Sequence, residues 1–285
     1  MAWRTCDECF GENGPTWSLE PAGISLGWSG GLAALRRVPV VLHESNAVPG
    51  LANRWLARWA VEVHVGFEAA ARYLPPEKVR FSGNPLRPEV LHAAERRGQK
   101  PRNDPLRIAI IGGSLGAATL NRAVLQALPE LARLPIVLVH QTGERAYPWV
   151  METIRSRWGE VPCNIQVVPF VEQMGELYAQ TDLLIARAGA MTLSEAVWCR
   201  VPMVLVPYPH AGTDEQRQNA RAVAQAGAAL LIEDAQFDGS RLVEVVQEFL
   251  RRPERLEEMA ARCEALARPD ATDQIVEAIV AYLPR

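Results

Sequence analysis

The chain has 285 residues, of which 48% are hydrophobic and 22% are charged, and a net charge of -3. This composition is ordinary for a soluble globular protein, and the length is sufficient for two domains. The charge gives no support for a nucleic-acid partner, whose binding surface would be basic. No apolar run approaches the roughly 20 residues that a membrane-spanning helix needs.

The start of the chain does not follow a helical or strand period. Residues 1–28 mix Gly, Pro, Trp and Cys, so we expect a loop or a poorly ordered segment. They also lack the basic and apolar regions of a signal peptide. Five widely spaced cysteines without an export signal indicate reduced thiols in a cytoplasm. Cys6 and Cys9 have the spacing of half a zinc site, but no second pair follows, so we expect no metal there.

From Gly30 onward, the hydrophobic pattern becomes regular. It predicts a helix over 32–37, a strand over 38–43, a helix over 51–60, a strand over 61–65 and a helix over 68–74. Phe81–Pro88 is predicted to be a rigid turn. Ala93–Asp104 is polar, has no apolar face and carries four basic residues, which is typical of an interdomain linker.

A second series of strands and helices follows the linker. The predicted strands are 107–111, 136–140, 165–168, 183–186, 203–206 and 228–232, and the predicted helices are 117–134, 173–180, 191–200, 240–251, 253–267 and 271–282, with another opening at Asp214. This alternation predicts an α/β protein with parallel sheets and right-handed crossovers. We expect a partial first domain (1–95), a linker (96–105), a complete doubly wound domain (106–268) and a C-terminal helix (269–285) that packs back on the first domain.

The stretch Ala186–Ala220 predicts a site for a nucleotide diphosphate. A strand runs into a turn at Arg187–Ala190, and a helix follows. Such a unit presents unpaired backbone N–H groups and the positive end of a helix dipole to an anion. Gly189 lets the anion approach because it has no side chain. Glu195 would repel a phosphate, but it can accept hydrogen bonds from the two hydroxyls of a ribose.

A structural alternative exists for the same residues. Thr192–Glu195 fits the capping-box pattern, in which Glu195 simply closes the start of the helix. Farther along, the strand over 203–206 ends in a Pro-Tyr-Pro-His loop, and Asp214–Gln216 opens another helix. Polar loops at two strand ends on the same edge of one sheet form a ligand crevice, which favours the nucleotide site.

Other strand ends carry polar or glycine-rich residues. His43, Glu44 and Asn46 follow the strand over 38–43, where they either bind a ligand or organise the next turn. Arg87 is either a solvated charge or a contact to a phosphate or carboxylate. Gly112–Gly116 is similar to a dinucleotide-binding turn but lacks its full spacing.

Six blocks of sequence, in this order, resemble the MurG family. They are HESNAVPGLANRWLA (His43–Ala57), GNPLR (Gly83–Arg87), IGGSLGAATLN (Ile111–Asn121), HQTG (His140–Gly143), RAGAMTLSEA (Arg187–Ala196) and PYPH…DEQ…NA (Pro207–Ala220). MurG is the peripheral membrane glycosyltransferase of peptidoglycan synthesis. The resemblance implies a GT-B fold, in which two Rossmann-like domains enclose the active site, with the N-terminal domain incomplete here.

The resemblance also implies a reaction. N-acetylglucosamine would pass from UDP-GlcNAc to lipid I (undecaprenyl-pyrophosphoryl-MurNAc-peptide), giving lipid II with inversion and without a metal or cofactor. The implied donor-binding residues are Phe170 and Val171 for uracil, Glu195 for ribose, Ser114 with Gly189, Ala190, Met191, Thr192, Leu193 and Ser194 for pyrophosphate, Gln216 and Asn46 for the sugar, and Arg87 near the nucleotide. His43 and Glu44 are the candidates for the base.

Departures from the family pattern keep other functions open. The family's N-terminal GGTGGH loop, which binds the acceptor diphosphate and carries a candidate base, has no match in this sequence. Leu115 and Glu215 stand where the family often has Gln and His. We therefore expect poor turnover. A UDP-sugar-binding protein without catalysis and a GT-B-shaped UDP-GlcNAc isomerase are the alternatives.

The resemblance further implies a cytoplasmic protein bound weakly to the inner leaflet of the cell membrane. The sequence offers only one helix for such a contact, with Arg54, Trp55, Arg58 and Trp59. An ordinary amphipathic helix explains these four residues, and we favour that explanation.

Overall fold

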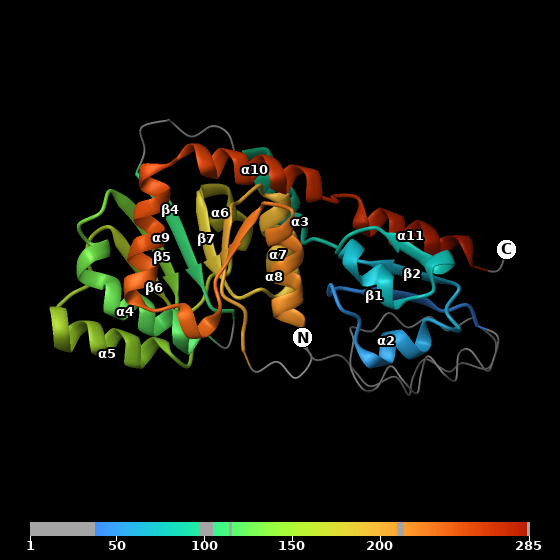
Figure 1. The fold of residues 1–285 in the computed structure, drawn as a ribbon, viewed down its shortest axis with the longest axis horizontal. Helices are drawn as coiled ribbons and strands as arrows, with labels where there is room; N and C mark the ends of the chain where they lie inside the picture. The colour runs from blue at the N-terminus through green and yellow to red at the C-terminus, as the bar shows by residue number, and fades with distance from the viewer. Residues whose placement is uncertain (1–37, 97–104, 114–115, 210–213, 284–285) are drawn as a thin grey trace.

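The computed structural model describes residues 38–96, 105–113, 116–209 and 214–283, which form one small and one large parallel sheet with helices around them (Figure 1). The predicted α/β class with two Rossmann-like sheets is confirmed. The predictions for residues 1–37, including Cys6 and Cys9, and for Ser114 and Leu115 lie outside the described residues.

The small sheet belongs to the first lobe, which we define as residues 38–87. Its parallel strands have the order β1-β2-β3, with bounds β1 Val41–Glu44, β2 Glu62–Val65 and β3 Val79–Phe81. The helices of this lobe are α2 Leu51–Leu56 and the 3₁₀ helices η2 Glu68–Tyr73 and η3 Pro76–Lys78. Leu42, Leu56, Val63 and Val65 are buried in a small core. Strand β3 was not predicted.

The large sheet has six parallel strands in the order β6-β5-β4-β7-β8-β9. Their bounds are β4 Leu106–Ile111, β5 Ile136–Gln141, β6 Ile165–Val168, β7 Leu183–Ala186, β8 Met203–Leu205 and β9 Ala229–Leu231. The chain starts in the middle with β4, adds β5 and β6 on one side, and then adds β7, β8 and β9 on the other. The strand order therefore reverses between β4 and β7, which is where open α/β sheets bind ligands.

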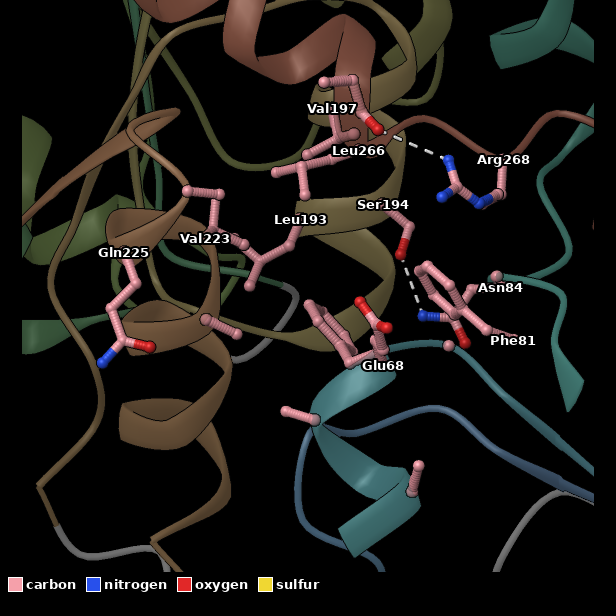
Figure 2. A pocket seen from close by; sticks show the side chains of 18 of the residues that line it. Glu68, Phe81, Asn84, Leu193, Ser194, Val197, Val223, Gln225, Leu266 and Arg268 are labelled. Atoms are coloured by element: carbon pink, nitrogen blue, oxygen red, sulfur yellow. Dashed lines mark hydrogen bonds between the residues drawn. The ribbon is translucent and has the colours of Figure 1, made fainter. Parts of the chain in front are cut away.

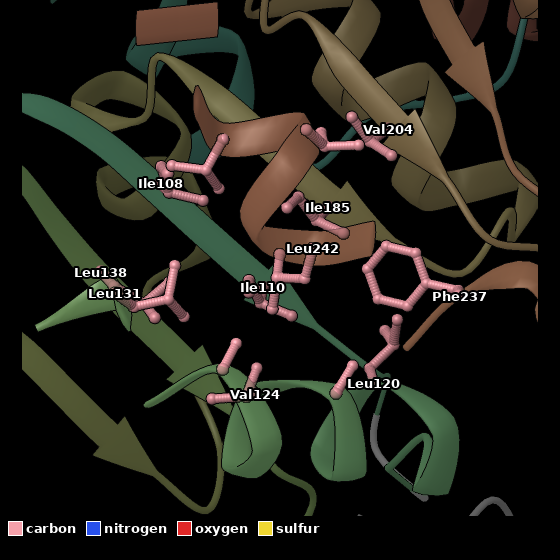
Figure 3. Packing of buried hydrophobic residues seen from close by; sticks show 14 of the residues in the cluster. Ile108, Ile110, Leu120, Val124, Leu131, Leu138, Ile185, Val204, Phe237 and Leu242 are labelled. Atoms are coloured by element: carbon pink, nitrogen blue, oxygen red, sulfur yellow. The ribbon is translucent and has the colours of Figure 1, made fainter. Parts of the chain in front are cut away.

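Helices cover both faces of the large sheet. Their bounds are α3 Pro88–Arg96, α4 Ala118–Leu131, α5 Tyr147–Trp158, α6 Met174–Gln180, α7 Ala190–Trp198, α8 Glu215–Gln225, η4 Asp234–Gln236, α9 Gly239–Arg251, α10 Glu254–Leu266 and α11 Ala271–Ala281. Successive residues of β4 face opposite sides. Ile108 and Ile110 pack with residues of α4, α5 and α9 (Figure 3). Ala109 and Ile111 pack with α3, α6, α7 and α8.

Helix α3 corrects the predicted start of the linker. Residues 93–96 continue this helix, and both Val90 and Ala93 are fully buried. The indole of Trp198 donates to the carbonyl of Leu91 at 3.2 Å. A Cβ at Gly175 would lie 2.4 Å from the carbonyl oxygen of Glu89, so only glycine lets α6 approach α3 this closely. By packing, α3 belongs with residues 105–268, and we call this set the second lobe.

After α10 the chain crosses back to the first lobe at Arg268. Its guanidinium lies over the ring of Phe81, 4.6 Å from the centroid. Gly83 has φ +90, and a Cβ there would be 2.5 Å from Cβ of Arg268. Both the backbone angle and the close contact therefore require glycine. In Figure 1, α11 continues from this crossing along the part of the molecule that holds β1 and β2. Its packing on the first domain stays a prediction.

The burial of His140, on β5, predicts that the protein loses stability in acid. Its side chain is fully buried, and burial lowers its pKa from 6.5 to about 4. The unfolded chain would take up this proton near pH 6.5, so the free energy of unfolding falls as the pH drops from about 6.5 to about 4. Burial also lowers the pKa of His43 and of His64, which adds to the effect. Between about pH 7 and about pH 5 we expect His140 to account for a loss of about 2 kcal/mol.

Urea unfolding at these two pH values measures this loss. His140→Gln should show a smaller decrease than the unmodified chain. Equal decreases for the two proteins would contradict the assignment to His140.

Candidate functional site

The turn between β7 and α7 is open to a ligand. Gly189 has extended backbone angles just before the first residue of α7, and a Cβ there would have only Oγ1 of Thr192 within 4 Å, at 3.8 Å. Gly189, Ala190 and Thr192 are half-buried, and Met191 is 39% exposed. The first backbone N–H groups of a helix lack partners within it. Within the part of the chain that the structure describes, the turn therefore offers unpaired donors to an anion at the edge of the sheet.

The capping-box explanation of Glu195 is wrong. Helix α7 begins at Ala190, which puts Thr192 inside the first turn and Glu195 in the second. No side chain of the described residues caps this helix start. Ser194, which lies between them, donates its hydroxyl to the carbonyl of Ala190 at 3.0 Å. Glu195 therefore does not close the start of its own helix, and its carboxylate is available to side chains from other elements.

Glu195 is buried and binds two other side chains. Arg87 of the first lobe makes a bidentate pair with it, with Nε 2.9 Å from Oε1 and Nη2 3.1 Å from Oε2. The hydroxyl of Tyr178, on α6, donates to Oε2 at 3.1 Å. The hydrogen bond to Glu195 raises the pKa of Arg87. Burial, followed by the charge of Glu195, raises the pKa of Tyr178 well above 10, so this tyrosine remains a donor.

At the end of β1, Glu44 organises its own loop. Oε1 accepts from the backbone and side-chain nitrogens of Asn46 at 2.9 and 3.3 Å. Oε2 accepts from the backbone of Gly50 at 3.1 Å and from the amide of Asn53 at 2.9 Å. These four bonds match the alternative in which Glu44 only shapes the turn. They leave the carboxylate little capacity to act as a base.

His43 is better placed for proton transfer. Nε2 lies 3.2 Å from the carbonyl oxygen of Gly83, so in the neutral ring Nε2 carries the proton and Nδ1 is the basic nitrogen. Burial lowers its pKa more than the Gly83 contact and Glu44 raise it. The ring is therefore neutral at neutral pH, as a general base must be.

Polar contacts join the two lobes beside the turn. Asn219, fully buried on α8, accepts from the backbone N–H of Ala47 at 2.7 Å and donates to Oδ1 of Asn46 at 3.0 Å. It also donates to the carbonyl of Ala188 at 3.3 Å. The amide of Asn84 donates to the hydroxyl of Ser194 at 2.9 Å. Asn219 and Asn84 occur in the sequence blocks of the family resemblance, but sequence reasoning assigned no role to either.

The remaining predicted residues lie on several strand ends and helices of the second lobe. Phe170 is 45% exposed after β6, and Val171 beside it is half-buried. Gln216, in the first turn of α8, accepts from the backbone N–H of Tyr208 at 3.0 Å. The side chain of Leu193 is fully buried, so a pyrophosphate at the turn could reach only its backbone. Gly116 has φ +76, and a Cβ there would lie 2.3 Å from a carbonyl oxygen, so its turn requires glycine.

The sequence of the chain is similar to those of known glycosyltransferases. Residues 107–275 match the family model described as "Glycosyltransferase family 28 C-terminal domain". The chain is 42% identical over 257 residues to the UDP-N-acetylglucosamine–N-acetylmuramyl-(pentapeptide) pyrophosphoryl-undecaprenol N-acetylglucosamine transferase of Moorella thermoacetica, covering 87% of this chain and 69% of that one.

Solved structures also resemble the chain. The crystal structure of Acinetobacter baumannii MurG has a TM-score of 0.77 at 32% identity, covering 91% of this chain and 73% of that one. The UDP-GlcNAc 2-epimerase of Neisseria meningitidis, solved with UDP-GlcNAc, has a TM-score of 0.61 at 15% identity, covering 89% and 72%. At that identity the epimerase shares the fold alone.

Proposed function

This chain belongs to the MurG family of glycosyltransferases, and from that premise we propose that it transfers N-acetylglucosamine from UDP-GlcNAc to lipid I to form lipid II. The observation that supports this proposal most is the open turn at Gly189–Thr192, which follows β7 at the reversal of strand order. A pyrophosphate at this turn would accept hydrogen bonds from the first N–H groups of α7 and lie at the positive end of its dipole.

The ribose would bind at Glu195, and Arg87 must then move. Both carboxylate oxygens already accept hydrogen bonds from the protein. A ribose diol can replace the guanidinium, because Arg87 is 44% exposed and can return to water or to a phosphate of the same nucleotide. Tyr178 is buried and would stay on Oε2. When the donor binds, the Arg87–Glu195 contact between the lobes would thus be replaced by a contact between Glu195 and the ribose.

The transfer step follows from this arrangement. Uracil would lie at Phe170 and Val171, and the sugar would lie near Gln216 and Asn46. Nδ1 of His43 would accept the proton of the attacking hydroxyl while UDP leaves with the electron pair of the glycosidic bond. The attack from the opposite side gives inversion. Asn46 is held by Asn219, so closure of the lobes positions the donor sugar against the acceptor.

Two measurements test the proposal together. Calorimetry with UDP-GlcNAc tests donor binding, and mass spectrometry of a mixture with a lipid I analogue tests lipid II formation. Binding with turnover supports the transferase. Binding without turnover would favour a UDP-sugar-binding protein, and no binding by folded protein would refute both. Conversion of UDP-GlcNAc to an isomer without an acceptor would identify an isomerase, for which the comparisons offer only a shared fold.

Tyr178 should determine how well Glu195 recognises the ribose. Tyr178→Phe removes the hydroxyl that fixes Oε2 but keeps the ring. We expect about a threefold to tenfold loss of UDP affinity, because one hydrogen bond to a charged group is lost. The preference for UDP over 2′-deoxy-UDP, measured by calorimetry, should fall as well. Tyr73→Phe, on the exposed surface, is the matched control. An unchanged preference would contradict this positioning role.

The exposed face of α2 supports a peripheral contact with an anionic membrane. Leu51 is 79% exposed and Trp55 49%, and Trp59, just after α2, is 48% exposed, whereas Leu56 and Ala57 face the core as in an ordinary amphipathic helix. Arg54 on α2 and Arg58 just after it are also exposed. Aromatic rings flanked by basic side chains suit the interface of an anionic bilayer. No helix among the described residues is long and apolar enough to cross a membrane.

A vesicle sedimentation assay tests this contact. Arg54→Gln with Arg58→Gln should lower partitioning onto phosphatidylglycerol vesicles at least tenfold, since each basic residue contributes about 1 kcal/mol. Arg133→Gln with Arg155→Gln, which neutralises two exposed charges of the second lobe, should have little effect. Equal losses for the two double variants would show that the surface of α2 is not the contact.

A further inference from the structure

A cavity of about 610 Å³ lies between the lobes. Its first wall comes from the ends of β2 and β3 and from η2, and its second wall comes from α7, α8 and the end of α10 (Figure 2). None of the residues Gly189–Thr192 lines it. The volume is within the range of small-molecule sites. Leu193 and Ser194, which the family resemblance places near the pyrophosphate, line the cavity, whereas Glu195 and His43 do not.

Apolar and polar surface contribute to the walls of the cavity in nearly equal measure. Leu193, Val197, Val223 and Leu266 enter from the second lobe, and Phe81 enters from the first (Figure 2). At the lobe contact, the amide nitrogen of Asn84 donates to the hydroxyl of Ser194, while its Oδ1 is buried without a partner among the described residues. An occupant with an apolar body would bury it against these side chains between the lobes.

Two arginines and one glutamate also line the cavity. Arg268 is fixed in place, because Nη1 donates to the carbonyl of Ala267 at 2.7 Å and the guanidinium stacks on Phe81. Arg72, on η2, is exposed and forms no ion pair with any described residue. Glu68 supplies the opposing charge. The side chains that line the cavity thus carry one net positive charge.

We propose that this cavity binds an amphipathic monoanion, a small molecule with an apolar ring body and one negatively charged head. The ring body would lie against Leu193, Val197 and Val223, and the head would lie near Arg72 and Arg268. Because the walls come from both lobes, an occupant would hold the lobes at one spacing. Its binding is therefore coupled to any change in that spacing.

Fluorescence titration of the whole chain with anilinonaphthalenesulfonate tests the proposal. This probe has aromatic rings and one sulfonate, and its neutral analogue N-phenylnaphthylamine lacks the charge. We expect saturable binding of one equivalent of the sulfonate. Ala222→Trp, which fills the cavity from α8, should abolish this binding. Ala261→Trp, on the exposed side of α10, should leave it unchanged.

A second variant, at the exposed Arg72, tests the site without changing the packing of the core. Arg72→Gln should weaken the sulfonate about threefold and leave the neutral analogue unaffected, as expected for one exposed ion pair. Two results together support the site. Ala222→Trp, but not Ala261→Trp, should lose sulfonate binding, and Arg72→Gln should weaken the sulfonate without affecting the neutral analogue. Three results would overturn it: no saturable binding, equal binding by Ala222→Trp, or complete displacement of the probe by saturating UDP. The last would place the probe in the donor site.

Discussion

Replacing Glu195 by glutamine is expected to lower the affinity for UDP between about tenfold and about a hundredfold. A carboxylate can accept from both ribose hydroxyls, and each hydrogen bond to a charged group contributes about 1.5–3 kcal/mol. The amide keeps one acceptor oxygen and turns the other position into a donor. The loss of the Arg87 pair works in the opposite direction, because the ribose no longer has to displace a guanidinium. Of these two opposing effects, the loss of the charged acceptor is the stronger.

Calorimetry with UDP and 2′-deoxy-UDP separates this effect from a change in folding. If Glu195 binds the ribose, removing the 2′-hydroxyl should weaken UDP in the unmodified chain but have little further effect in Glu195→Gln. Glu172→Gln, on an exposed carboxylate before α6, is the control for a simple change in net charge. Unchanged UDP affinity in folded Glu195→Gln would refute the ribose assignment while leaving the fold and family intact.

The strands of the second lobe were predictable from sequence because burial on both faces makes them continuous apolar runs. Strands β6 and β7 have the predicted bounds, and the others differ by one residue at one end or at both ends. Helix α3 was missed, since Val90 and Ala93 give it only a narrow apolar face. That face is sufficient because Gly175 lets α6 come close, and a tertiary contact of this kind has no local signal.

The candidate site was predictable from sequence only where its residues lie close together in the chain. Gly189 and Glu195 follow one strand, so their spacing alone indicates an anion site and a nearby acceptor. Arg87 is 108 positions from Glu195 and Asn46 is 173 from Asn219, and nothing local to either pair predicts that they meet. Tyr178 looks like an ordinary core residue in a short helix. These pairings depend on how the lobes dock, which a single sequence does not encode in any local pattern.

The second large expected effect is at Asn219, a fully buried side chain whose hydrogen bonds join the two lobes. Asn219→Ala would leave the N–H of Ala47, the carbonyl of Ala188 and Oδ1 of Asn46 without the partner they have now. Leaving buried polar groups unsatisfied costs about 1–3 kcal/mol each, and water entering the space would offset part of this. We expect the free energy of unfolding to fall by about 2–4 kcal/mol.

Asn219→Ala should also weaken donor binding. Asn219 binds the carbonyl of Ala188, just before Gly189, and the side chain of Asn46. We expect UDP-GlcNAc to lose more affinity than UDP, because Asn46 is placed at the sugar and the turn serves both ligands. Urea unfolding gives the stability, and calorimetry with the two ligands gives the ratio. Arg221→Ala, exposed on the same helix, should change neither. A stability loss with an equal decrease for both ligands would make Asn219 a structural link only, because a misaligned Asn46 must affect the ligand that carries the sugar.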